Sequence, residues 1–321
     1  MRALASPASL KGVLSPVAAA AHLAAGLRRV AGVQADELPV ADGGDGTAEV
    51  LHASLGGEWQ TAVVSDPLGR PVAARWLMLP DRTAVVESAQ AIGLALLRPE
   101  ERDPLAASSR GLGELLVATL VTRPSALLVC PGGTATVDGG AGMIAVVGNW
   151  LKEIPIRVAC DVRNPLLGER GAARVFGPQK GADAAAVEEL ETRLAAMDGL
   201  ARYRDLPGAG AGGGLGAAFA ALGGALLDGG ELVLTLVRFD ERARHADLVV
   251  TGEGTVDATT FDGKAPSAVI RHCERLDVRC ELFGGAVCDG LDAHPLSGDP
   301  ALAAEDLVQL GEELALAAVG A

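Results

Sequence analysis

Short apolar runs along the chain alternate with longer stretches in which apolar residues recur at helical spacing. Short runs bounded by glycine, proline or charged residues predict buried strands, and helical spacing predicts amphipathic helices. The predicted strands cover residues 59–65, 72–79, 83–88, 126–130, 154–160, 247–250 and 279–283. The predicted helices cover residues 16–30, 112–122, 182–197, 215–227, 264–276 and 312–319. Because strands and helices alternate along the chain, the pattern favours an α/β fold with a parallel sheet.

The region from residue 59 to residue 88 departs from this alternation. Three predicted strands follow one another there, and a turn at residues 66–69 with Pro67 and Gly69 joins the first two. We expect these three strands to be antiparallel. The whole pattern predicts a Rossmann-like parallel α/β domain built from both chain ends, residues 1–70 and 246–321. An inserted mixed α/β domain of residues 71–245 completes the prediction, with the active site in the cleft between the two domains.

Four polar loops that contain glycine or follow a strand end directly also carry acidic residues. They are residues 41–47 with Asp42, residues 132–142 with Asp138, residues 160–161 with Asp161, and residues 251–257 with Glu253 and Asp257. Ligands of open α/β sheets bind beyond the carboxyl ends of the strands, where glycine lets backbone amides approach an anion closely. Carboxylates beside a phosphate need a hard cation such as Mg²⁺ between them. The four loops together therefore favour phosphoryl transfer with Mg²⁺, although an Asx turn or a helix cap explains any single loop.

The charge and the cysteine content argue against several classes of protein. The chain has 27 Lys and Arg against 41 Asp and Glu, a formal net charge of −14. This balance argues against a nucleic-acid partner and against a polybasic membrane-binding surface. The five cysteines are scattered, with no CxxC pair and no Cys/His cluster, so we expect neither a disulfide framework nor structural zinc. Without a signal-peptide pattern at the N-terminus, we expect a cytoplasmic location.

Of two common nucleotide-binding motifs, one is absent and the other occurs without its usual preceding strand. No GxxxxGK[ST] motif is present, since Ala265 follows Lys264 where the motif needs Ser or Thr. The segment Gly208–Gly213 fits GxGxxG, but it follows a polar segment instead of a predicted strand. A dinucleotide-dependent oxidoreductase stays open as an alternative on this motif alone. A close approach of the glycine backbone to a phosphate or to another backbone is the other interpretation.

Several strings resemble motifs of the type I glycerate kinase family, in the family's order over most of the chain. They are Pro39–Thr47, Arg102–Pro104 with Ser108–Gly111, Gly132–Met143, Val158–Val162 with Asn164–Leu166, Phe176–Ala182, Pro207–Ala217, and Val250–Gly254 with Asp257. The resemblance implies a two-domain α/β kinase. Such a kinase moves the γ-phosphoryl group of ATP to a hydroxyl of D-glycerate with Mg²⁺, giving 2-phosphoglycerate.

The resemblance and the loop chemistry together predict the site residues. The catalytic candidates are Asp42, Asp138, Asp161 and Lys11, with Asp42 or Asp161 orienting or deprotonating the attacking hydroxyl. The candidate Mg²⁺ ligands are Asp138, Asp161 and Glu253. Substrate or phosphate contacts are expected from Arg110, Gly132, Gly133, Thr134, Gly139, Lys180, Glu253, Asp257 and Lys264. ATP and Mg²⁺ are the expected cofactors, a small hydroxy acid the expected substrate, and a homodimer the candidate assembly.

Three positions depart from the family pattern. Ala8 stands where the family has an aspartate, Val137 where it has an asparagine, and Thr255 where it has an arginine. Each change removes a polar or charged group from a loop expected to hold substrate, and losing one such arginine can cost about 10³-fold in rate. The alternatives are a divergent member with weakened or lost activity, acting on another hydroxy acid or as a binding or regulatory protein.

Overall fold

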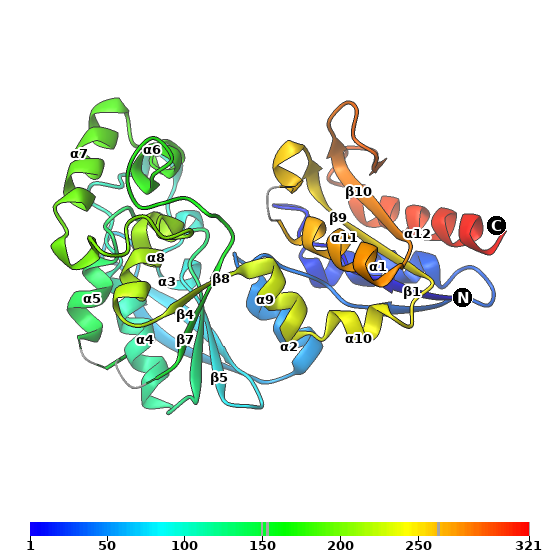
Figure 1. Ribbon diagram of the computed structural model, residues 1–321, viewed down its shortest axis with the longest axis horizontal. Coiled ribbons are helices and arrows are strands. Elements are labelled where there is room, and N and C mark those ends of the chain that lie inside the picture. Colours follow the sequence, from blue (N-terminus) through cyan, green and yellow to red (C-terminus); the bar gives the residue numbers. More distant parts are fainter. Residues whose placement is uncertain (149, 152–153, 262–263, 321) are drawn as a thin grey trace. The chain divides into compact units, whose positions relative to one another are not determined.

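The computed structural model describes residues 1–148, 150–151, 154–261 and 264–320. The chain forms two compact units, whose elements Figure 1 labels. Unit 1 comprises Met1–Asp42, Glu49–Leu55 and Gly230–Ala321, and unit 2 comprises Gly43–Ala48 and Gly56–Gly229. The chain therefore enters unit 2 at Gly43, returns to unit 1 for Glu49–Leu55, enters unit 2 again at Gly56 and leaves it after Gly229.

Unit 1 contains a five-stranded sheet whose described pairings are all parallel. The strands in sheet order are β11 (His294–Pro295), β10 (Cys280–Val287), β9 (Leu248–Val256), β1 (Arg2–Ala5) and β2 (Gln34–Glu37). The helical elements are α1 (Pro16–Leu27), α2 (Thr47–Leu55), α9 (Gly229–Leu236), α10 (Phe239–Ala243), η5 (Ala258–Phe261), α11 (Ala265–Leu276) and α12 (Ala303–Val319). Because β1 pairs with β9 from Ala3↔Leu248 to Ala5↔Val250, both chain ends build one parallel sheet, as predicted.

Helices α1 and α12 pack closely together in unit 1. Helix α1 begins at Pro16, and the side chain of its N-cap Ser15 accepts a hydrogen bond from the Ala18 backbone at 3.2 Å. Gly26 lies against the backbone of Val308 on α12, so a Cβ atom at residue 26 would collide with the Val308 carbonyl oxygen. The small residue therefore sets how closely the two helices approach.

Unit 2 contains a six-stranded mixed sheet. Its strands in sheet order are β3 (Glu58–Ser65), β4 (Pro71–Met78), β5 (Thr83–Glu87), β6 (Ala126–Cys130), β7 (Ile156–Cys160) and β8 (Ala225–Asp228). The β3–β4 and β4–β5 pairings are antiparallel, which confirms the prediction for this region, and the remaining pairings are parallel. The α-helices are α3 (Ala89–Ile92), α4 (Arg110–Val121), α5 (Ala141–Val147), α6 (Ala172–Phe176), α7 (Ala184–Ala195) and α8 (Ala211–Ala221). The 3₁₀ helices are η1 (Leu94–Leu96), η2 (Pro99–Glu101), η3 (Pro178–Lys180) and η4 (Asp198–Leu200).

Several element boundaries differ from the predicted ones. The predicted loop at residues 251–254 is part of β9, because β10 continues to pair with β9 as far as Val287↔Val256. The predicted helix at residues 215–227 ends at Ala221, and Gly223, with φ of 88°, precedes the edge strand β8. Helix α12 begins at Ala303, nine residues before the predicted start at residue 312.

The chain changes units at residues other than 70 and 246. Strand β3 pairs with β4 along its full length, from Glu58↔Met78 to Ser65↔Pro71, so residues 58–65 belong to the sheet of unit 2. At the other boundary, most of α9 and all of α10 belong to unit 1.

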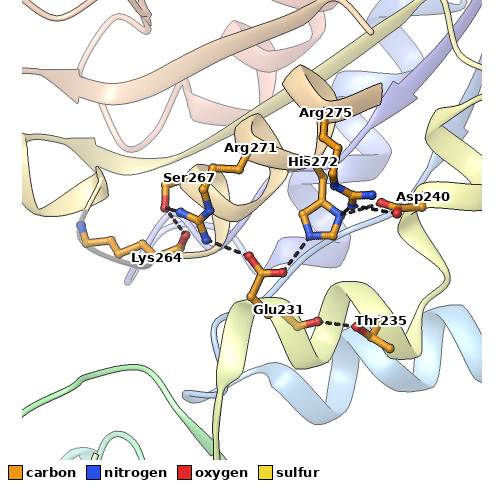
Figure 2. Close-up of polar contacts among 8 residues, drawn as sticks. All are labelled: Glu231, Thr235, Asp240, Lys264, Ser267, Arg271, His272 and Arg275. Carbon is orange, nitrogen blue, oxygen red and sulfur yellow. Dashed lines mark hydrogen bonds and ion pairs between the residues drawn. The ribbon is translucent and has the colours of Figure 1, made fainter. Parts of the chain in front are cut away.

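Helices α9 and α10 are joined to α11 by a network of charged side chains (Figure 2). His272 of α11 lies between two carboxylates: its Nδ1 is 2.6 Å from Asp240 Oδ1 and its Nε2 is 2.8 Å from Glu231 Oε2. Arg271 donates to Glu231 at 2.9 Å, and Arg275 donates to Asp240 at 2.8 Å. Partial burial opposes ionisation of both carboxyls, but the hydrogen bonds from His272 and the arginines outweigh it and lower each pKa.

This network predicts an acid-dependent loss of stability on substituting Asp240→Asn. Because the pKa of Asp240 is lowered in the folded protein, its carboxylate stabilises the fold above the ordinary pKa of about 4. That contribution disappears as the pH falls through the lowered pKa. We expect D240N to lower the free energy of unfolding by about 1 kcal/mol at pH 7 and by progressively less below about pH 5. Urea unfolding at a series of pH values measures this difference.

The exposed loop residue Asp205 provides the control, since the Asp205 side chain is 90% exposed. Asp205→Asn should leave stability unchanged across the same pH range. A D240N effect that stays constant down to pH 3 would contradict the assignment of the stabilisation to the ionised carboxylate.

Candidate active site

The carboxyl ends of β5, β6 and β7 lie next to one another in unit 2. Strand β5 runs parallel to β6 with Glu87 opposite Cys130, and β6 runs parallel to β7 with Val129 opposite Val158. The segments that follow these strands therefore start at one edge of the sheet. This edge is where ligands of open parallel sheets bind, so it is the candidate active site.

Three of the predicted loops meet at this edge. A Cβ atom added to Gly132 would lie 3.0 Å from Gly44 Cα and 3.5 Å from Asp161 Oδ2. Gly43, with φ of 91°, packs against β7, and a Cβ atom there would lie 2.5 Å from the Ala159 carbonyl oxygen. Only glycine fits these positions, so the backbones of residues 43–44 and 132 lie in direct contact, with the Asp161 carboxylate beside them.

Lys180 is the buried cation of this site. Its side chain is only 4% exposed, and its Nζ donates to Thr134 Oγ1 at 3.2 Å and to the Thr136 carbonyl oxygen at 2.8 Å. Burial lowers the pKa of Lys180 to about 7, while the charges of Asp138 and Asp161 act in the opposite direction. A buried amine beside glycine amides and two carboxylates can bind an anion as a point charge.

Asp138 accepts hydrogen bonds from the backbone around it. Its Oδ2 accepts from the Ser109 amide at 2.8 Å and from Ser109 Oγ at 2.7 Å, and its Oδ1 accepts from the Gly140 amide at 3.0 Å. The neighbouring Gly139 packs against the end of α7, where a Cβ atom would lie 3.0 Å from Leu194 Cδ2 and 2.5 Å from Sδ of Met197 just beyond the helix. These contacts fix the loop ahead of α5, and the catalytic and metal-binding roles of Asp138 stay predictions.

The side chain of Arg110 contacts its own helix. Arg110 begins α4, is 63% exposed, and donates from Nε to Glu114 Oε1 at 2.8 Å. Glu114 also accepts from the Ser65 backbone at 2.8 Å, so this ion pair is tied to β3. The substrate contact predicted for Arg110 would require its guanidinium to exchange Glu114 for a ligand.

A second group of predicted residues gathers at the carboxyl end of β9 in unit 1. Lys264 Nζ is 3.2 Å from both carboxylate oxygens of Glu253 and 4.0 Å from Asp257 Oδ1. Thr260 Oγ1 donates to Glu253 at 2.6 Å. Lys11 is exposed, and its backbone amide borders the same strand, 3.3 Å from where a Cβ of Gly254 would be.

The remaining catalytic and metal candidates are divided between the units. Asp42 is half-buried and is the last residue of unit 1 before the chain enters unit 2. Among the predicted Mg²⁺ ligands, Asp138 and Asp161 belong to unit 2 and Glu253 to unit 1. Within the described residues, no three His, Cys, Asp or Glu side chains form a group that could hold a metal ion.

Two of the three residues that depart from the family pattern, Ala8 and Val137, are buried. Val137 is 1% exposed and belongs to the apolar core of unit 2, so its side chain is stabilised by burial. Ala8 is buried, and its amide donates to the Gly252 carbonyl oxygen at 2.8 Å. Thr255 is exposed on β9.

The GxGxxG segment packs against the candidate phosphate-binding loop. Gly212 and Gly213 both have positive φ, and a Cβ atom at Gly213 would collide with the Thr136 carbonyl oxygen. A Cβ atom at Gly212 would lie 2.6 Å from the Pro131 carbonyl oxygen. The glycines therefore serve a close approach of two backbones, and no predicted or observed strand directly precedes the segment, as a dinucleotide fingerprint requires.

Sequence reasoning missed one buried acid at the site, Glu87. It is the last residue of β5, is 3% exposed, and accepts from the Ala48 amide at 2.9 Å. Burial, together with the nearby charge of Asp45, raises the pKa of Glu87 to about 7 against the opposing hydrogen bonds. A glutamate that ends a run of buried β-branched residues was the available signal.

None of the helices in the described part of the chain combines the length and apolarity that crossing a bilayer requires.

Comparisons with known proteins agree with this fold. A sequence profile of the Glycerate kinase family matches residues 3–151 and 146–304. The chain is 39% identical to the glycerate 2-kinase of Escherichia coli (strain K12), over 90% of this chain and 86% of that protein. It is 38% identical to the glycerate kinase of Bacillus subtilis (strain 168), over 89% of this chain and 85% of that protein.

A solved structure agrees as well. The crystal structure of a protein assigned as glycerate kinase 2 from Salmonella typhimurium LT2 superposes with a TM-score of 0.86. The match is 33% identical in sequence and covers 100% of this chain and 98% of that one. The resemblance predicted from the motifs is therefore confirmed, and the chain belongs to the glycerate kinase family.

Proposed function

We propose that this protein is an ATP-dependent kinase that phosphorylates D-glycerate to 2-phosphoglycerate. Membership of the glycerate kinase family supports the activity. The observation that carries the proposal is the meeting of Gly44, Gly132 and Asp161 at one sheet edge, with Lys180 buried close to Asp161. Phosphoryl transfer uses groups of these kinds, namely glycine backbone amides, a buried amine and a carboxylate.

The residues of unit 2 suit the phosphates of ATP. Gly133 is exposed between the buried Gly132 and Thr134, and Thr134 Oγ1 accepts from Lys180, whose amine would bind an oxygen of the transferred phosphate. Asp161 beside Gly132 supplies a hard carboxylate oxygen, and Mg²⁺ needs only one or two protein carboxylates when phosphate oxygens complete its coordination shell. Asp161 and Asp138 would be the candidate ligands from unit 2, and Glu253 of unit 1 stays a candidate by prediction. When bound, Mg²⁺ neutralises charge on the phosphate oxygens.

The proposed reaction balances with a single proton transfer. The glycerate hydroxyl oxygen forms a bond to the γ-phosphorus, and the bond from that phosphorus to the bridging oxygen of ADP breaks. Asp42 or Asp161 would accept the hydroxyl proton. Lys11, Arg110 and Lys264 would bind the glycerate carboxylate or phosphate oxygens, and Glu253 and Asp257 position Lys264.

The finer assignments are also proposals. We propose that the protein acts in the cytoplasm as a homodimer, and the cleft expected between the domains stays a prediction. Ala8, Val137 and Thr255 keep a second candidate open, a family member that acts on another hydroxy acid or binds ligand without turnover. A coupled assay with ATP and D-glycerate separates the candidates, since nucleotide binding without phosphorylation of any hydroxy acid would support the second one.

The first test of the site is Asp161→Asn. The substitution preserves the size of the side chain but removes the charge beside Gly132, so we expect kcat to fall by at least about 10³-fold. The melting temperature should change by less than about 2 °C, because the half-buried loop residue contributes little to the core. Asp205→Asn, which changes an exposed turn, is the control and should retain full activity. A melting-temperature loss as large as that of a core deletion would instead identify Asp161 as structural.

The second test is Lys180→Met. Methionine preserves the apolar stem and removes the buried amine, so the fold loses a desolvated charge and should keep its stability. We expect the dissociation constant for ATP, measured by calorimetry, to rise at least about tenfold, because the phosphates lose a charge-assisted hydrogen bond. An unchanged ATP affinity in folded K180M would remove Lys180 from the proposed phosphate site.

A further inference from the structure

Glu87 is a buried acid to which the proposed reaction gives no role. It ends β5 directly opposite Cys130 of β6, in the row of strand ends that forms the candidate site. Its side chain is 3% exposed, and burial raises the pKa of the carboxyl to about 7. Burying a carboxyl costs free energy unless hydrogen bonds compensate it, so its partners indicate what it does.

Two partners of Glu87 belong to the loop that carries the first glycine motif, and a third, Gln90 of α3, donates from Nε2 to Glu87 Oε2 at 3.4 Å. Glu87 Oε1 accepts from the Ala48 amide at 2.9 Å, and the Gly46 amide also donates to the carboxyl. Thr47 closes the turn from within, with its Oγ1 donating to the Gly44 carbonyl oxygen at 2.7 Å. The buried Ala48 amide at the end of the turn therefore has its acceptor on a distant strand, β5, and the half-buried Gly46 amide shares that acceptor.

The same loop forms one wall of the candidate site. Gly43 packs on the Ala159 backbone, Gly44 lies against Gly132, and Asp45 lies near Gly133. The contacts of Gly43 and Gly132 leave no room for a Cβ atom, so a small shift of the loop would change the surroundings of Asp161. The loop's position thus depends on β7 and the Gly132 loop on one side and on Glu87 on the other.

We propose that Glu87 is a positioning residue that holds residues 43–48 in the arrangement that receives the phosphates of ATP. The proposal rests on the proposed kinase function, but the contact itself can be tested without any substrate. Glu87 does not supply a ligand to the nucleotide. It acts through the amides of Gly46 and Ala48, and loss of the acceptor would leave the buried Ala48 donor unsatisfied.

Amide hydrogen exchange in the ligand-free protein tests the contact. In Glu87→Ala we expect the Gly46 and Ala48 amides to exchange at least tenfold faster than in the wild type. Glu87→Gln keeps one acceptor oxygen, so it should show a smaller change in the same amides, and it serves if E87A folds poorly. Unchanged exchange at residues 43–48 in both folded variants would overturn the proposal.

Asp66→Asn is the matched control. Asp66 is also a buried carboxylate, 6% exposed, and it accepts from the backbone amides of Leu68 and Arg70 in the β3–β4 turn. D66N should speed exchange in its own turn and leave residues 43–48 as they are. Faster exchange of residues 43–48 in D66N would show a general loss of stability and overturn a specific role for Glu87.

Steady-state kinetics test the consequence for the reaction. We expect E87A to raise KM for ATP about tenfold with kcat changed less than threefold, and E87Q to recover most of the loss. A merely structural role would lower the active fraction, and hence kcat, without changing KM, and that result would overturn the positioning role. If the wild type phosphorylates no hydroxy acid, the proposed function fails by itself, and ATP affinities of wild type and E87A measured by calorimetry replace KM. Equal affinities would then overturn the proposal for Glu87.

Discussion

Parallel pairing of β5, β6 and β7 is the constraint on which the candidate site depends. In a parallel sheet all carboxyl ends face the same edge, so the residues that follow three separate strands start side by side. Glu87, Gly132 and Asp161 are far apart in the sequence and occupy that edge for this reason alone. The glycines then allow backbone to approach backbone, with the Asp161 carboxylate beside Gly132 and the Lys180 amine bonded to the Thr136 carbonyl oxygen.

Burial gives the charged groups of this edge their chemical character. Lys180 and Glu87 carry opposite charges when ionised, yet burial shifts the pKa of each towards about 7. Each side chain also has hydrogen-bond partners from a loop that belongs to the site, Thr134 and Thr136 for the lysine and Ala48 for the glutamate. The polar groups that shape the site are therefore buried groups whose transfer from water costs free energy unless hydrogen bonds compensate it.

The fold class was predictable because strands and helices have different hydrophobic periodicities. The turn residues at 66–69 likewise predicted the antiparallel pairing of β3 and β4. The residues next to the strand ends were predictable for the same reason, as Gly132 and Asp161 show. Glu87 was not, because the Ala48 amide that it binds lies 39 residues away and only the folded sheet brings them together. The sequence of a glycine-rich loop also does not tell whether its acidic residue faces a ligand or accepts a hydrogen bond from the protein. Asp138, for example, accepts from the Ser109 amide.

The pairing of β1 with β9 has a consequence for biosynthesis. Residues 2–5 emerge from the ribosome more than 240 residues before their neighbour at 248–256, so β1 lacks one partner during most of translation. Unit 2 is encoded almost entirely between these two strands and can bury its own core first. The nascent N-terminal strand must meanwhile be kept from pairing with other chains, a task for which its short length of four residues is suited.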